Sequence, residues 1–245
     1  MRVLKLFLIL FCASVISCSD DDTTPTEGSL SLQFNHNWNE VPIDFNELKY
    51  TNNFGQNMSI TKLRYLISNI VLHNTDRTLR KIEDYILVDL NNEHVTLIIP
   101  NIPFQNYHGI SFTFGFNEAD NIDGAYPDLN SESWNWPTML GGGYHFMQLE
   151  GKYDSSGVEK PYAYHMGTAR ISTGVFEQNY FEVILGGFNF SQEGALNIHM
   201  NLAEWFTNPY DWNLETYNVD LMMNYDAQKL MNDNGKTVFS LGEIN

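Results

Sequence analysis

The chain has 245 residues, a formal net charge of −17, 43% hydrophobic residues and 14% aromatic residues, which suits one large or two small globular domains rather than a disordered chain. Thirty acidic residues against thirteen basic ones repel phosphate, so the composition argues against nucleic acid as a partner. Two cysteines cannot form a disulfide scaffold.

The N-terminus predicts an export signal. Arg2 and Lys5 precede an apolar run over residues 6–13 that is too short for a stable membrane anchor. Residues 15–18, Val-Ile-Ser-Cys, resemble a bacterial lipobox, so we expect cleavage before Cys18 and lipidation of that cysteine; ordinary secretion with cleavage nearby is the alternative. Residues 1–17 are thus interpreted as a lipoprotein signal peptide. This predicts a bacterial outer-membrane lipoprotein facing the periplasm or the cell surface.

Residues 18–28 are the predicted acidic and polar linker. Its first part, Ser-Asp-Asp-Asp at residues 19–22, resembles the acidic export signal of Bacteroidetes surface lipoproteins, and a solvated linker is the alternative interpretation. Residues 23–28 have the composition of a linker. The rest of the chain, residues 29–245, contains no repeat and no sign of a second domain, so we expect a single domain there.

From residue 29 onward the dominant hydrophobic period is two, which is typical of β-strands. The expected strands are residues 30–36, 65–72, 85–90, 95–99, 112–116, 144–150, 162–166, 181–185, 196–202 and 237–241. Asn, Asp and Gly in the segments between them indicate turns.

One segment has a helical pattern, residues 218–232, and Asn234-Gly235 predicts its C-terminal cap. A short turn is also expected at residues 203–206. The predicted fold class is all-β: an antiparallel β-sandwich with long loops and one short C-terminal helix.

The common enzyme motifs are absent from the sequence: it has no Gly-x-Ser-x-Gly elbow, phosphate loop, dinucleotide fingerprint or His-Glu-x-x-His helix. Carboxylates are numerous, but no spacing singles out a pair for glycoside hydrolysis. We therefore do not expect an enzyme.

Four histidines lie within apolar strands or at their ends. His36 continues the apolar face of residues 30–34, and His145 shares a face with residues 147 and 149. His165 precedes Met-Gly, and His199 lies between Ile and Met. Imidazole suits copper and zinc, and nearby thioethers favour Cu(I), so the four could converge on a metal. The alternative for each is a buried histidine with a hydrogen-bond partner. The other three, His73, His94 and His108, are assigned to the surface.

Short motifs in a fixed order carry a family resemblance. They are Phe34-Asn35-His36, Leu63-x-Tyr65-x-Ile67-Ser68-Asn69, Phe112-x-x-Gly115-Phe116-Asn117, Trp134-Asn135-Trp136, Gly143-Tyr144-x-Phe146 and Tyr164-His165-Met166-Gly167. This series resembles the MbnP-like copper-binding proteins over residues 30–167, and more weakly beyond.

The resemblance implies a secreted or envelope β-rich protein that binds copper and has no organic cofactor. In that family, copper is held by histidines and by a tryptophan that a partner di-haem peroxidase oxidises to kynurenine. His36 and His165 match family positions and are the first ligand candidates. His145 and His199 are local inferences from this sequence. We expect His36, His165 and at least one of the other two to lie close together.

Trp134 and Trp136 are the candidates for a modified ligand or a pocket wall. Residues 137–142 depart from the family spacing, and aromatic packing is the alternative role for both side chains. Pro137 restricts Trp136 to an extended backbone, and glycines at 141–143 let the loop fold back onto residues 144–150. We therefore expect one indole to border the histidine cluster.

Three functions compete at this stage, and the third, a hydrolase with an unrecognised carboxylate pair, is the least favoured because no spacing singles out a pair. The first is an envelope lipoprotein that binds copper through a histidine cluster. The second is a surface-exposed module that binds glycan or protein without metal, suggested by five tryptophans, thirteen tyrosines and the loop at residues 134–143. Metal content and glycan binding would discriminate between them.

Overall fold

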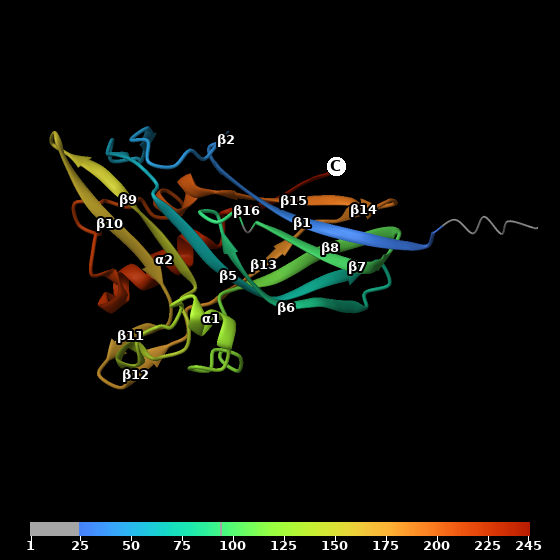
Figure 1. The fold of residues 1–245 in the computed structure, drawn as a ribbon. Coiled ribbons are helices and arrows are strands. Elements are labelled where there is room, and N and C mark those ends of the chain that lie inside the picture. The colour runs from blue at the N-terminus through green and yellow to red at the C-terminus, as the bar shows by residue number, and fades with distance from the viewer. Residues whose placement is uncertain (1–24, 94) are drawn as a thin grey trace, which may run out of the picture.

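The computed structural model describes residues 25–93 and 95–245 (Figure 1). The long strands are β1 (Glu27–Trp38), β5 (Lys62–Asn74), β6 (Leu79–Asp89), β7 (Thr96–Pro103), β8 (Gln105–Phe114), β9 (Met147–Ser155), β10 (Val158–Met166), β13 (Phe181–Leu185), β15 (Gly194–Asn201) and β16 (Phe239–Ile244). The short strands are β2 (Val41–Pro42), β3 (Tyr50–Thr51), β4 (Asn57–Met58), β11 (Ala169–Ser172), β12 (Val175–Glu177) and β14 (Phe188–Phe190). The helices are α1 (Pro127–Ser131) and α2 (Tyr225–Gly235), and single 3-10 turns are η1 (Thr138–Leu140), η2 (Leu202–Phe206) and η3 (Leu221–Met223).

Each strand expected from the period-two pattern overlaps one of the long strands, so the all-β prediction is confirmed. The short turn expected at residues 203–206 is η2. The signal peptide, Cys18 and most of the linker lie outside the described residues.

A five-stranded and a nine-stranded sheet form the sandwich. In the smaller sheet β15 lies between β16 and β1, and the other edge of β1 pairs with β7 and β2. β1 and β15 run parallel, whereas the other strand pairs among the described residues are antiparallel. The sandwich is thus antiparallel, as expected, except at this one pair. The sequence does not show that exception, because a period of two reports the buried face of a strand and not its direction.

The larger sheet forks at its central strand, β5. One edge of β5 pairs with β6, and the other edge pairs with β9 over residues 62–65 and with β8 over residues 67–74. The N–H of Leu66, between these two stretches, donates to the carbonyl oxygen of Phe146, and its carbonyl oxygen accepts from the N–H of Gly115. The chain between the two branches, residues 115–146, emerges at the fork, and we call it the fork loop.

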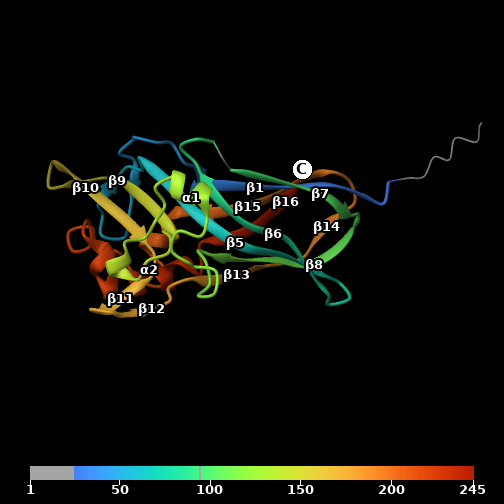
Figure 2. The ribbon, with the colours of Figure 1, turned by 60° about the horizontal axis from the view of Figure 1, so that its bottom comes forward.

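Strand alternation gives the larger sheet two different faces. Its inner face packs on the smaller sheet and carries fully buried side chains such as Tyr65 of β5 and Met147 of β9. Its outer face carries a second apolar cluster, made of Leu66, Leu87, Phe116, Leu129, Trp134 and Tyr144. Four of these six residues come from the fork loop, which therefore covers the outer face with a small core of its own. Figure 2 shows α1, which is part of this loop, lying over β5 and β9.

The C-terminal helix is present, but it spans Tyr225–Gly235 and not residues 218–232. The side chain of Asn224 accepts a hydrogen bond from the N–H of Ala227 and so sets the start of α2, while η3 occupies the residues before it. Asn234 is not a terminal cap: it is fully buried, and its amide donates to the carbonyl oxygens of Trp205 and Tyr210. Among residues 25–93 and 95–245, no helix is long and apolar enough to cross a membrane.

Candidate metal centre

The fork loop delivers two tryptophans to His145. The N–H of His145 donates to the carbonyl oxygen of Trp134 at 2.9 Å, and the N–H of Trp136 donates to that of Gly143 at 2.9 Å. These bonds fold the end of the loop back on itself. The imidazole centroid of His145 lies 5.4 Å from the ring of Trp134 and 4.9 Å from the ring of Trp136. Both indoles are at most 1% exposed, so they wall the histidine off from solvent.

His165 lies beside the same ring. Its centroid is 5.4 Å from that of His145, and the two ring planes are nearly perpendicular at 86°. The strand register explains the placement: His165 of β10 is opposite Gln148 of β9, which is opposite Arg64 of β5. These three side chains share the outer face of the larger sheet, beneath the fork loop.

A carboxylate orients the ring of His165. Its Nε2 lies 2.9 Å from Oε1 of Glu150, and that carboxylate also accepts a hydrogen bond from Lys62 at 3.2 Å. The bond to His165, followed by the bond to Lys62, lowers the pKa of Glu150 to about 2, so the carboxylate is charged and acts only as an acceptor. Nε2 of His165 therefore carries the proton. When the ring is neutral, its lone pair is on Nδ1.

His145 is an uncharged imidazole. Burial lowers its pKa to about 3, and the nearby His165, Lys62 and Arg64 act in the same direction. Its Nδ1 is buried and has no hydrogen-bond partner among the described residues. Leaving a buried polar atom unpaired is costly, so an atom of this kind calls for an explanation such as an ion. Nε1 of Trp134 and Oε1 of Gln148 are also buried without a hydrogen-bond partner among the described residues.

Arg64 packs against the indole ring of Trp134, which also contacts His145. Its guanidinium carbon lies 5.1 Å from the centroid of the indole ring, as in a cation–π contact. Two carboxylates hold the guanidinium there, Asp89 at 3.1 Å from Nε and Glu132 at 2.9 Å from a terminal nitrogen. The indole of Trp134 is thus held between a cation and His145.

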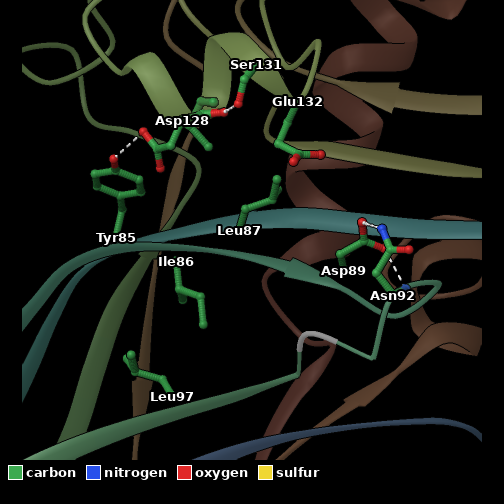
Figure 3. Close-up of a pocket in the computed structure, with 10 residues that line it drawn as sticks. Tyr85, Ile86, Leu87, Asp89, Asn92, Leu97, Asp128, Ser131 and Glu132 are labelled. Carbon is green, nitrogen blue, oxygen red and sulfur yellow. Dashed lines mark hydrogen bonds between the residues drawn. The ribbon is translucent and has the colours of Figure 1, made fainter.

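A cavity of about 450 Å³ opens beside this arrangement, between β6 and α1 (Figure 3). Leu87 lies at its floor, and Tyr85 donates a hydrogen bond to Asp128 at 2.7 Å on its wall. Asp89 and Glu132, the two partners of Arg64, also line it. The cavity is acidic and shares its wall with the ion pairs that hold Arg64.

The structure does not place His36 or His199 at this pair of histidines. His36 points from β1 toward the inner face, where its Nε2 lies 2.9 Å from the hydroxyl of Tyr65. Arg64 and Tyr65 are consecutive in β5, so they point to opposite faces of the sheet, and His36 and His165 lie on opposite faces as well. His199 lines an open cavity of about 410 Å³ with residues of β1 and β16. Contrary to expectation, His36 and His165 therefore do not lie close together.

The other histidines assigned to the surface are His73, His94 and His108. His108 is exposed, whereas His73 is partly buried and its Nε2 lies 2.7 Å from the hydroxyl of Ser111. His94 lies outside the described residues.

Sequence reasoning missed the polar residues around the two rings: Lys62, Arg64, Gln148 and Glu150. All four point outward from β5 and β9, and the alternation in those strands could have shown that they share a face. What it could not show is the pairing register that puts Glu150 beside His165.

These side chains fit a metal ion with nitrogen ligands. Two imidazoles that bind one ion through bonds of about 2.0 Å need ring centroids within about 6 Å of each other, and 5.4 Å meets that requirement. His145 is neutral, as metal binding requires of an imidazole ligand. Across the described residues, no three His, Cys, Asp or Glu side chains are grouped as metal ligands. The donor set is a histidine pair and not a larger cluster.

The fold and this centre define a β-sandwich that carries a pair of histidines walled by tryptophan. A family model described as MbnP matches residues 27–224, and the chain belongs to the MbnP family. Among solved structures it is similar to MbnP from Methylosinus trichosporium, with 14% identity, a TM-score of 0.58, and coverage of 88% of this chain and 98% of that chain. At this identity the similarity concerns the fold. A comparison with curated proteins gives no match.

Proposed function

We propose that the protein is an envelope lipoprotein that binds copper between His145 and His165 and does not turn over a substrate. The observation that carries the proposal is a pair of rings with centroids 5.4 Å apart, His145 buried and His165 partly buried, in which Nδ1 of His145 has no hydrogen-bond partner among the described residues. Imidazole is a suitable copper ligand. Membership of the MbnP family and the motif resemblance to copper-binding members support the same metal.

The residues around the pair have separate roles in this proposal. Glu150 keeps the proton on Nε2 of His165 and leaves Nδ1 free for the ion. Burial keeps His145 unprotonated at neutral pH. The indoles of Trp134 and Trp136 exclude water. Bound copper would supply a redox-active ion in this dry pocket.

The proposal includes oxidation of Trp134 or Trp136 to kynurenine by a partner di-haem peroxidase. Indole has no basic lone pair, whereas the ketone and the aniline nitrogen of kynurenine can both bind a metal. Both indoles contact the ring of His145, so either product would lie next to the ion. The intact mass of protein from its native envelope reports the modification, with recombinant protein made without a peroxidase as the control. Unmodified tryptophan in the native protein would remove this part of the proposal.

The lipid anchor rests on the sequence of the first eighteen residues. The apolar run at residues 6–13 and the lipobox ending at Cys18 support membrane attachment through several acyl chains, which hold firmly where one holds weakly. In detergent phase partition we expect the native protein in the detergent phase and a Cys18→Ser variant in the aqueous phase. A variant that stays with the detergent would contradict the anchor.

A Cu(I) competition titration tests the metal site. We expect the recombinant protein to bind one equivalent of copper, and His145→Ala or His165→Ala to weaken binding by about 10-fold or more, since each removes a ligand of the proposed pair. His199→Ala is the matched control, because His199 lies on a different sheet, at an open cavity. Equal affinity in all four proteins would refute the site.

The glycan-binding alternative loses its main support. All five tryptophans, including both in the fork loop, are at most 7% exposed. None of them offers an open face on which a sugar could stack.

A further inference from the structure

A single amide of α2 holds the backbone of the proposed copper site from behind. Gln228 is fully buried, and its Nε2 donates to the carbonyl oxygen of His165 at 2.7 Å and to that of Leu221 at 3.1 Å. Its Oε1 accepts from the N–H of Gly167 at 3.2 Å. Oε1 also accepts from the side-chain amide of Asn179 at 3.4 Å. Both ends of the side chain are therefore committed, and two of its four bonds fix the strand end that carries His165.

The bond to Gly167 reaches the other side of the site. A Cβ added to Gly167 would lie 2.5 to 2.8 Å from the indole ring of Trp136, so that ring rests directly on the glycine. Trp136 in turn lies edge-on against His145, with centroids 4.9 Å apart and ring planes at 85°. Moving the backbone at residues 165–167 would thus displace His165 directly and His145 through Trp136.

We infer that Gln228 is a positioning residue that sets the distance between the rings of His145 and His165; this inference rests on the proposed copper site. The family match ends at residue 224, whereas α2 begins at Tyr225. The element that holds the centre therefore lies beyond the matched part of the chain. Supporting groups outside the ligands themselves commonly change metal affinity by about 10- to 100-fold.

The same helix provides a matched control. Asn232, one turn further along α2, is also buried, and its amide donates to two carbonyl oxygens, those of Asn179 at 2.8 Å and Tyr180 at 3.2 Å. Neither bond touches the strand that carries His165. Gln228→Met and Asn232→Leu each replace a buried amide by an apolar side chain of similar size, so both should lower the stability of the fold.

Two measurements on these variants test the inference. In the metal-free protein, NMR should show displaced resonances for the Trp136 indole N–H and the His165 ring in Gln228→Met, and native positions in Asn232→Leu. Cu(I) affinity should fall about 10-fold or more in Gln228→Met and stay within about twofold in Asn232→Leu. If Gln228→Met does not fold, Gln228→Glu replaces it, because that change keeps the shape of the side chain and removes the amide that donates to the carbonyl oxygens of His165 and Leu221.

The outcomes separate the two proposals. Native resonances and native affinity in Gln228→Met would overturn the positioning role, as would equal losses in both variants. If the wild type binds no copper, the proposed function fails. Displaced resonances confined to Gln228→Met would then still establish that Gln228 positions the two rings.

Discussion

At the scale of single residues, the centre depends on two imidazoles in different surroundings. His145 is neutral because it is buried, with its pKa lowered to about 3. His165 is only partly buried, and its ring is directed by the carboxylate of Glu150. A charged carboxylate behind a ligand fixes the tautomer and makes the ligand a better donor.

Glu150→Gln tests this role. The substitution removes the negative charge that attracts both Lys62 and the Nε2 proton of His165. We therefore expect Cu(I) affinity to fall about 10- to 100-fold. Competition titration measures the change. Glu159→Gln is the control, because Glu159 lies on the same hairpin but pairs with Lys152 in solvent. Equal affinities in the two variants would contradict an orienting role for Glu150.

His145, His165, Trp134 and Trp136 are among the candidates that the sequence offers, because they are rare residue types in marked motifs, but so are His36 and His199, which the fold places elsewhere. Their partners could not be read in the same way. Lys62, Arg64 and Glu150 are common surface residue types, and only the β5–β9–β10 register shows that they meet beneath the fork loop.

At the scale of elements, the fork loop is a separate packing unit. Its apolar side chains, among them Phe116 and Leu129, join Leu66 and Leu87 in a cluster apart from the main core. This cluster holds Trp134, and through it His145, against the outer face of the sheet. The loop should therefore be able to open without unfolding the sandwich.

Leu129→Ala tests that independence. Leu129 is 1% exposed, and removing a buried leucine side chain costs about 2–5 kcal/mol. We expect faster hydrogen exchange in residues 115–146, weaker copper binding and unchanged protection in β1 and β15. Leu196→Ala, in the main core, is the comparison and should lower protection throughout the domain. Faster exchange everywhere in Leu129→Ala would contradict a separate unit.

The sequence predicts which segments form strands and helices. It predicts less well where these elements end and which strands pair. Period two identified the long strands because each has one buried face. The predicted start of α2 is too early because the polar and apolar residues at 218–224 follow an order compatible with a helix. The capping bond of Asn224 sets the actual start at Tyr225. The parallel pairing of β1 with β15 joins segments more than 150 residues apart, which no local pattern reports.

At the scale of the whole molecule, the two sheets separate the histidines by face. The family motifs at His36 and His165 suggested one site, but the alternation of β5 puts Tyr65 and Arg64 on opposite sides. His36 belongs to the interior of the sandwich, where burial lowers its pKa to about 3. It therefore affects the pH dependence of stability.

His36→Leu should reveal that dependence. Below pH 6.5 the unfolded chain protonates His36 while the folded protein does not, so the wild type loses stability as the pH falls toward 3. The free energy of unfolding of His36→Leu relative to the wild type should rise by about 1.4 kcal/mol for each pH unit below 6.5. Urea unfolding at pH 7, 6 and 5 measures it. A difference that does not change with pH would show that His36 titrates normally in the fold.

The most direct test of the copper site is a crystal structure of the copper-loaded protein with anomalous scattering measured at the copper edge. The account predicts one strong peak between the rings of His145 and His165, beside Trp134 and Trp136. A peak at His36 on the inner face, or no peak within bonding distance of both rings, would contradict it.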